Sequence, residues 1–162
     1  MPDPASLYEQ DFVRWSEDQA AALREAARSG TNLPLDWENL AEEIDSLGRS
    51  QRSELGHRIG TIIEQLLKLQ FSSAVEPRRG WEDTIDRERS RTERLLAYNP
   101  SLRPLVPETV QDELPRARRH ATRALDRHGE ASPAVRAGLD AASFTTDEVM
   151  GDWFPSKAAP EE

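Results

Sequence analysis

The stretch WENLAEEIDSLGRSQRSELGHRIGTIIEQLLKLQF, residues 37–71, decides the fold of this chain. Apolar side chains return every three or four residues from Leu40 to Leu69, which is the spacing of one helix face. The phase of this pattern survives Gly48, whereas two unrelated helices would lose their register there. The stretch therefore predicts one helix of roughly 50 Å, capped by Asp36 and free to bend at Gly48. Its second half is apolar over a wide arc, so we expect other helices to pack on it.

A first helix is expected upstream of this stretch, and it begins at a capping box. Ser6 can accept a hydrogen bond from the amide of Glu9, while the Glu9 side chain reaches back to Ser6. One apolar stripe at helical spacing follows, made of Tyr8, Phe12, Trp15, Ala22 and Ala26. Gly30 ends the pattern, and residues 31–35 are expected to form a loop.

Two more helices are expected downstream, after a loop over residues 75–80. The third helix covers residues 81–98 and ends before Asn99, because the residue before a proline disfavours the helical backbone. The fourth helix begins near Pro107, which suits a first helical position. It contains Pro115, which should kink it.

Beyond Gly129 the periodicity weakens. Thr145 and Glu148 form a second capping box, which predicts a short turn, and Trp153 and Phe154 are expected to dock the end of the chain. The predicted fold is all-α: a helical bundle of about four main helices, with a long central helix two and a short C-terminal turn. We expect a single domain over residues 1–162, with an ordered core at about 6–155 and flexible termini.

The composition excludes several classes of protein. The chain has no cysteine, which removes disulfides, thiol catalysis and cysteine-ligated zinc. Its net charge of −9 disfavours nucleic acid as a partner. We expect no signal peptide, because residues 1–8 hold no basic region followed by an apolar run, and no apolar run in the sequence is as long as a membrane span. We therefore expect a cytoplasmic protein without a membrane segment and without a cofactor.

Several short strings along the chain point together to one bacterial family. They are Leu7-Tyr8, Asp11-Phe12, Trp15, DWENLAEEIDSLGRSQR at 36–52, LLKLQ at 66–70, Trp81 with Thr84-Ile85, PSLRP at 100–104, and Phe154-Pro155. Over residues 7–155 the sequence resembles the domain of unknown function 29 family of cyanobacteria and proteobacteria. The resemblance implies a compact helical protein. It implies no activity and no catalytic residue, because the family has none assigned.

Four carboxylates gather near the start of the long helix: Glu38, Glu42, Glu43 and Asp45. Three of them fall on one helix face, at a spacing that can hold Mg²⁺ for a hydrolase acting on nucleotides or phosphates. The same face continues with Arg49, and Asp45 with Arg49 is a favourable i,i+4 ion pair. An internally paired, solvated face is therefore the competing interpretation.

The fourth helix carries the strongest local concentration of positive charge. Arg116, Arg119, Arg123 and Arg127 step by three, four and four residues and so form one stripe. Such a stripe can bind an anion, a nucleic acid or the acidic face of a partner. It lacks interleaved aromatic side chains that would stack on bases. A solvated face without a partner is the alternative interpretation.

Gly56 and Gly60 form a small-residue seam on the long helix, which Ile63 and Leu67 continue. Two glycines in a helix interior cost roughly 1 kcal/mol each relative to alanine. We therefore expect another helix to approach this seam closely, either from the same chain or from a second subunit. The overlapping E-x-x-H motif at residues 54–57 stands alone, whereas di-iron bundles use two, so we expect an exposed histidine and no metal.

The sequence by itself assigns no biochemical activity. Our leading hypothesis is a non-enzymatic protein-interaction module of a bacterial cytoplasm. It would contact a protein partner, or a second copy of the chain, through helix two or helix four. The alternative is a metal-dependent nucleotide or phosphate hydrolase that uses the acidic face of helix two.

Overall fold

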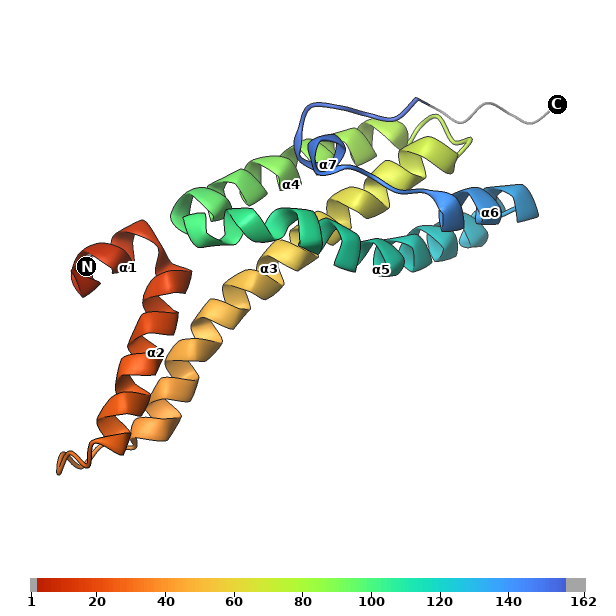
Figure 1. The fold of residues 1–162 in the computed structure, drawn as a ribbon. Helices are drawn as coiled ribbons and strands as arrows, with labels where there is room; N and C mark the ends of the chain where they lie inside the picture. Colours follow the sequence, from red (N-terminus) through yellow and green to blue (C-terminus); the bar gives the residue numbers. More distant parts are fainter. Residues whose placement is uncertain (1–2, 157–162) are drawn as a thin grey trace. The chain divides into compact units, whose positions relative to one another are not determined.

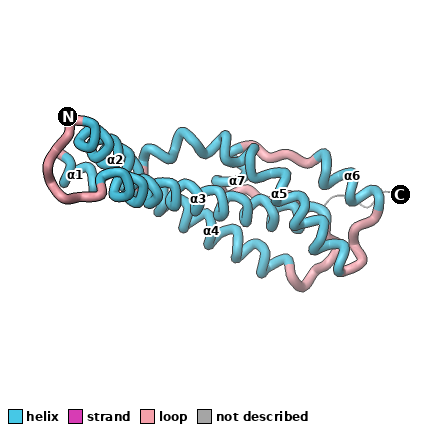
Figure 2. The backbone as a smooth tube through the Cα atoms, turned by 90° about the horizontal axis from the view of Figure 1, so that it is seen from below, coloured by secondary structure: helices cyan, strands magenta, loops and turns pink. Residues whose placement is uncertain are grey.

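The computed structural model describes residues 3–156, and within them every regular element is a helix (Figure 1, Figure 2). These residues form seven α-helices and one 3₁₀-helix. The all-α prediction is confirmed, while the count of four main helices is not. None of the described helices is long and apolar enough to cross a membrane. The expectation of flexible termini concerns residues 1–2 and 157–162, which lie outside the described residues.

The contacts between Cα atoms divide the chain into two compact units. In the described part, the first unit holds residues 3–55 and 94–105, and the second holds residues 56–93 and 106–156. Two helices, α3 (Trp37–Phe71) and α4 (Arg78–Tyr98), therefore contribute a part to each unit. A single domain over residues 1–162 stays a prediction.

The long helix expected from the sequence is confirmed as α3, one continuous element across Gly48. The side chain of Asp36 accepts a hydrogen bond from the amide of Asn39 at 3.3 Å, as its capping role requires. In the second unit, α3 supplies these fully buried side chains: Ile59, Ile62, Ile63, Leu66, Leu67 and Leu69. Each contributes roughly 1.5–3 kcal/mol by leaving water. The second part of α3 is thus the core element of that unit.

The single helix expected upstream of α3 is instead two helices, α1 (Pro4–Gln10) and α2 (Phe12–Arg28). Asp11 separates them with an extended backbone, and its carboxylate caps α2 by accepting from the amide of Arg14 at 3.0 Å. The same carboxylate accepts from the amide and the hydroxyl of Ser101, at 2.7 and 2.8 Å. The one-helix prediction was wrong because a residue far along the chain stabilises the break.

The capping box expected in this first region was also wrong. The aromatic residues of the expected stripe contact one another, but they do not form the buried side. The hydroxyl of Ser6 accepts from the side-chain amide of Gln10, and not from the amide of Glu9. Tyr8 of the expected stripe is 47% exposed, whereas Val13 and Ser16 are buried. The new cap at residue 11 restarts the helix, so a different set of side chains turns inward.

In the first unit, the buried side of α3 also differs from the apolar stripe. Ala41 is buried, whereas Leu40 and Leu47 are 40% and 47% exposed. α2 packs on the side of α3 that holds Gly48, where the side chain of Ser16 lies against that glycine. The side of α3 that α2 covers is therefore the side with small residues, and not the side with the bulkiest apolar residues.

α4 ends at Tyr98, before Asn99 as predicted, and a 3₁₀-helix, η1 (Pro100–Leu105), follows. α4 begins at Arg78, before Trp81, so the preceding loop is shorter than expected. The side-chain oxygen of Asn99 accepts from the amide of Val13 at 3.1 Å, and its nitrogen donates to the carbonyl of Leu95 at 3.1 Å. Asn99 therefore joins the start of α2 to the end of α4 within the first unit.

The second unit is completed by α5 (Val106–Arg127), which continues through Pro115, and by α6 (Pro133–Ala141). α6 was not expected from the sequence, because nine residues are too few to show a helical periodicity. Ser132 caps this helix by accepting from the amide of Val135 at 3.2 Å.

The C-terminal segment is docked, as predicted. The capping box of Thr145 and Glu148 begins α7 (Thr146–Met150). Arg89 of α4 is buried and donates to three backbone carbonyls of the C-terminal segment, at 2.7–2.9 Å. Its guanidinium also lies 5.1 Å from the centre of the Phe154 ring. One buried arginine therefore holds the end of the chain on the second unit.

Candidate functional site

α5 is divided lengthwise into a buried side and a charged side. Its buried side chains lie at helical spacing and are Val106, Val110, Leu114, Ala117, Ala121 and Leu125. On the opposite side lie four arginines, which we call the arginine face: Arg116, Arg119, Arg123 and Arg127. All four are exposed. Within the part of the chain that the structure describes, no hydrogen bond or ion pair engages their guanidinium groups.

Several other arginines of the second unit differ from the arginine face because they have structural partners. Arg136 lies 2.6 Å from the carboxylate of Asp126. Arg118 donates to the carbonyl of Ala142 and so links α5 to the segment after α6. The charges of the arginine face are not used in this way, so they are available to a ligand from solvent.

A shallow groove follows the flank of the arginine face beside α6. It encloses about 420 Å³ and is lined by Pro115, Arg118, Arg119, Thr122, Arg123 and Asp140. Two members of the arginine face are thus part of a concave surface. A partner segment that binds there would contact both positive charge and a concave surface.

On its other flank, α5 faces α3 across a small pocket of about 70 Å³. Arg116 and His120 line it from α5, and Glu64 and the exposed His57 line it from α3. The carboxylate of Glu64 lies 2.9 Å from the ammonium of Lys68 and 3.4 Å from Nδ1 of His120. The pocket has both signs of charge and room for roughly two water molecules, so it suits solvent better than an organic ligand.

The glycine seam of α3 is occupied from within the chain. A Cβ atom added at Gly56 or Gly60 would lie 2.9 or 3.0 Å from a carboxylate oxygen of Glu113. Ile63 and Leu67, which continue the seam, are fully buried in the core of the second unit. The seam therefore receives a side chain of α5, which is one of the two approaches expected from the sequence.

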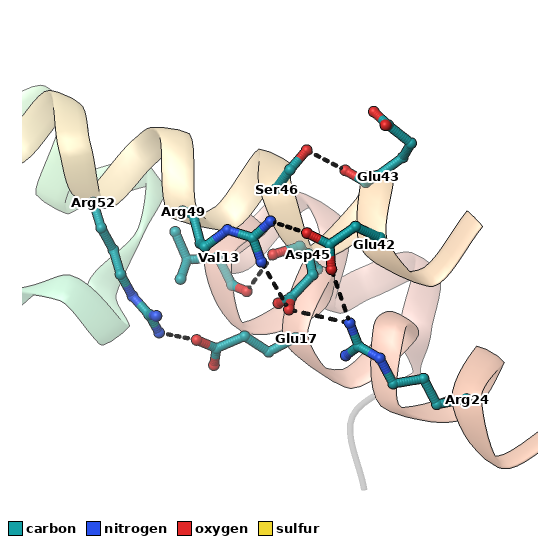
Figure 3. Close-up of polar contacts among 10 residues, drawn as sticks. Val13, Glu17, Arg24, Glu42, Glu43, Asp45, Ser46, Arg49 and Arg52 are labelled. Atoms are coloured by element: carbon teal, nitrogen blue, oxygen red, sulfur yellow. Dashed lines mark hydrogen bonds and ion pairs between the residues drawn. The ribbon is translucent and has the colours of Figure 1, made fainter. Parts of the chain in front are cut away.

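The acidic face of α3 lies in the first unit, where arginines neutralise part of it (Figure 3). Glu42 lies 2.5 Å from Arg49 and 3.5 Å from Arg24. Asp45 lies 3.1 Å from Arg49 and 3.4 Å from Arg24. Arg24 belongs to α2 and gave no signal in the sequence, because only the packing of α2 on α3 brings it to these carboxylates.

The remaining two carboxylates of the acidic face do not join this cluster. Glu38 and Glu43 are exposed, and in Figure 3 the side chain of Glu43 points away from the arginines. A separate ion pair joins Arg52 to Glu17 further along the same two helices. Among the described residues, no group of three or more His, Asp or Glu side chains is arranged to hold a metal ion.

A family model matches the sequence of this chain, and a solved structure has a similar helical fold. The family model described as domain of unknown function DUF29 matches residues 7–154. The solved structure of an alpha-helical protein of unknown function from Rhodospirillum rubrum ATCC 11170 is similar, with a TM-score of 0.67 and 24% identity. The similarity covers 91% of this chain and 98% of that one. No curated protein matches the sequence.

Proposed function

This chain belongs to the domain of unknown function 29 family, and we propose that it is a protein-interaction module that holds an acidic segment of a partner protein on its arginine face. One observation carries the proposal: four exposed guanidinium groups, without partners among residues 3–156, stand in one row on a chain of net charge −9. The cytoplasmic, bacterial setting expected from the sequence is part of the same proposal. No catalytic step is proposed.

The geometry of the arginine face suits a row of carboxylates. From Arg116 to Arg127 the face extends for about 16 Å along the helix axis. Each guanidinium can donate two parallel hydrogen bonds to one carboxylate. A partner segment with one acidic residue per helical turn can therefore pair with all four arginines. Exposed ion pairs of this kind contribute about 0.2–1 kcal/mol each, so we expect weak binding that depends on salt.

Charge and composition favour a protein segment over a nucleic acid. The net charge of −9 repels a polyanion as a whole, and the arginine face holds no aromatic side chain for stacking on bases. A short acidic segment meets only the local positive potential. A second copy of this chain also carries acidic surface, so self-association through the arginine face is a competing outcome.

Fluorescence anisotropy tests the proposal directly. The probe is a labelled helical peptide of about 15 residues with one glutamate per turn. We expect the variant Arg119→Glu with Arg123→Glu to bind it roughly 10- to 30-fold more weakly, because two attractions become repulsions. The matched control is Arg14→Glu with Arg94→Glu, which reverses two exposed arginines of the first unit and changes the net charge equally. The control should bind like the wild type.

Three results would overturn the proposal. Both double variants losing affinity equally would mean that net charge alone matters. Unchanged binding by the reversed arginine face would mean that the contact lies elsewhere. A single-stranded oligonucleotide that binds more tightly than the peptide, with a steep dependence on salt, would make nucleic acid the ligand.

The hydrolase alternative gains no support from the geometry of the acidic face. Glu42 and Asp45 would have to exchange the guanidinium groups of Arg24 and Arg49 for a metal ion. A thermal-shift titration with Mg²⁺ and with Mn²⁺ is its test, because a specifically bound ion stabilises the folded state in proportion to ln(1 + [L]/Kd). A saturable shift that Asp45→Asn removes would favour the hydrolase over the interaction module.

A further inference from the structure

A hollow opens at the C-terminal end of the arginine face, and we call it the Trp81 hollow. It encloses about 510 Å³ in the second unit, between the end of α3, the start of α4 and the end of α5. Its principal lining residues are Lys68, Pro77, Trp81, Leu125, Arg127 and His128. Ligand pockets in proteins commonly measure about 300–1,000 Å³. The Trp81 hollow is therefore large enough for a whole side chain of a bound segment.

The walls of the Trp81 hollow are mainly apolar. Leu125 is buried, and the indole of Trp81 is half-buried, with part of its surface left open to a ligand. The side chain of Lys68 is 14% exposed and its ammonium lies 2.9 Å from the carboxylate of Glu64. Because its charge is held there, the aliphatic stem of Lys68 adds to the apolar wall.

The rim of the Trp81 hollow carries a positive charge, which comes from Arg127. Arg127 and His128 are exposed on it, and Arg127 also belongs to the arginine face. Glu130 lines the hollow as well, but its carboxylate is already engaged. It accepts from the hydroxyl of Ser72 at 2.9 Å and from the amide of Ser73 at 2.6 Å. Charge complementarity therefore favours an apolar group that is flanked by negative charge.

We propose that the Trp81 hollow receives one aromatic or branched apolar side chain from the acidic segment that the arginine face binds. This inference rests on the proposed function. Arg127 is common to both surfaces, so a segment whose carboxylates follow the arginine face arrives at the hollow where the face ends. The partner sequence is thereby specified as a row of acidic residues with an apolar anchor residue at one end.

A pair of peptides tests the anchor without knowledge of the natural partner. Both are the labelled glutamate-rich peptide of the anisotropy experiment; one carries phenylalanine near each end, and the other carries alanine at the same positions. Burial of one large apolar side chain is expected to make the phenylalanine peptide bind the wild type roughly 10- to 100-fold more tightly.

A substitution that fills the hollow should remove this preference. Ala124 lines the hollow, so Ala124→Leu places a larger side chain in it. We expect this variant to bind both peptides with the affinity that the wild type shows for the alanine peptide. The matched control is Ala97→Leu on the exposed surface of α4 in the first unit, which should keep the full preference.

The outcomes separate this inference from the proposed function. Equal binding of both peptides by the wild type overturns the anchor and leaves the arginine face standing. Binding of neither peptide overturns both. A preference that persists equally in Ala124→Leu and Ala97→Leu places the anchor elsewhere and overturns the assignment to the hollow.

A spectroscopic readout keeps the inference testable if Ala124→Leu does not fold. Seating of the phenylalanine peptide should shift the tryptophan emission of the wild type, and Trp81→Phe should lose that shift while the alanine peptide causes none. A shift of the same size in Trp81→Phe would contradict the proposed location.

Discussion

The side chain of Ser16 on α2 lies against the Cα of Gly48 on α3, closer than any side chain at residue 48 would permit. Ser16 is fully buried, and its hydroxyl donates to the carbonyl of Val13 at 2.7 Å. The glycine therefore serves the close approach of two helices in the first unit. From the sequence alone, Gly48 had suggested only a place where a long helix can bend.

This contact predicts that substitutions at residues 16 and 48 change the free energy of unfolding in a non-additive way. Gly48→Ala should lower the free energy of unfolding by about 1–3 kcal/mol, because the new methyl group overlaps the Ser16 hydroxyl. Ser16→Ala alone should cost about 1 kcal/mol through its lost hydrogen bond. The double variant should cost less than the sum, since the overlap is gone. Urea unfolding of the four proteins measures this coupling.

Gly80 provides the control for the effect of alanine on helix stability. It lies in α4, and an added Cβ would meet no described atom within 4 Å. Gly80→Ala should therefore raise the free energy of unfolding by up to about 1 kcal/mol. If Gly48→Ala stabilises the protein as Gly80→Ala does, the close approach of α2 and α3 is not as described.

Arg89 is expected to be a stabilising residue of the second unit. Burial lowers the pKa of its guanidinium, and the group is kept there by three carbonyls and the Phe154 ring. Arg89→Lys keeps a positive charge but replaces two donor nitrogens, Nε and Nη2, by one, so it should lower the free energy of unfolding by about 2–4 kcal/mol. Hydrogen exchange should increase first in residues 146–154.

Arg79→Lys is the matched control for Arg89→Lys, because Arg79 lies exposed on the same helix. It should change neither the unfolding free energy nor the exchange of the C-terminal segment. An Arg89→Lys protein whose C-terminal amides exchange as slowly as those of the wild type would contradict the docking role of this arginine.

Glu130 predicts a pH-dependent contribution to stability. Burial would raise its pKa, but the hydrogen bonds from the Ser73 amide and from the Ser72 and Ser73 hydroxyls outweigh burial and hold the pKa below its usual value. A lowered folded-state pKa stabilises the protein at neutral pH. That stability is lost as the pH falls from the usual carboxyl pKa of 4.5 through the folded-state value.

Glu130→Gln should therefore be less stable than the wild type at neutral pH, and the difference should shrink in acid. Chemical denaturation from about pH 7 to about pH 3 measures it. Glu76→Gln, at an exposed position of the adjacent loop, is the control and should show no such convergence. A constant difference between Glu130→Gln and the wild type at every pH would contradict the role of the carboxylate charge.

Local sequence patterns predicted those elements whose determinants lie close together in the chain. α3 followed from its own periodicity, and α7 from the capping box of Thr145 and Glu148. The break at Asp11 did not, because it depends on Ser101, a contact between distant segments. The pairing of the acidic face with Arg24 and the seating of Glu113 against the glycine seam depend on helix packing in the same way.

The arginine face was predicted as a set of residues, but its surroundings were not. A spacing of three and four places the four side chains on one side of α5, so the sequence suffices for the stripe itself. The groove beside α6 required a helix that the sequence did not reveal. The Trp81 hollow combines α3, α4 and α5, and no local pattern brings their residues together.

The most direct test of partner binding by the arginine face is affinity capture from the native host with three baits, analysed by quantitative mass spectrometry. The baits are the wild type, the arginine-face reversal (Arg119→Glu with Arg123→Glu) and the first-unit reversal (Arg14→Glu with Arg94→Glu). We expect the wild type and the first-unit reversal to capture one protein in stoichiometric amount, and the arginine-face reversal to lack it. That protein should carry an acidic segment that cross-links to α5. The same partner on all three baits, or none on any of them, would contradict partner binding by the arginine face.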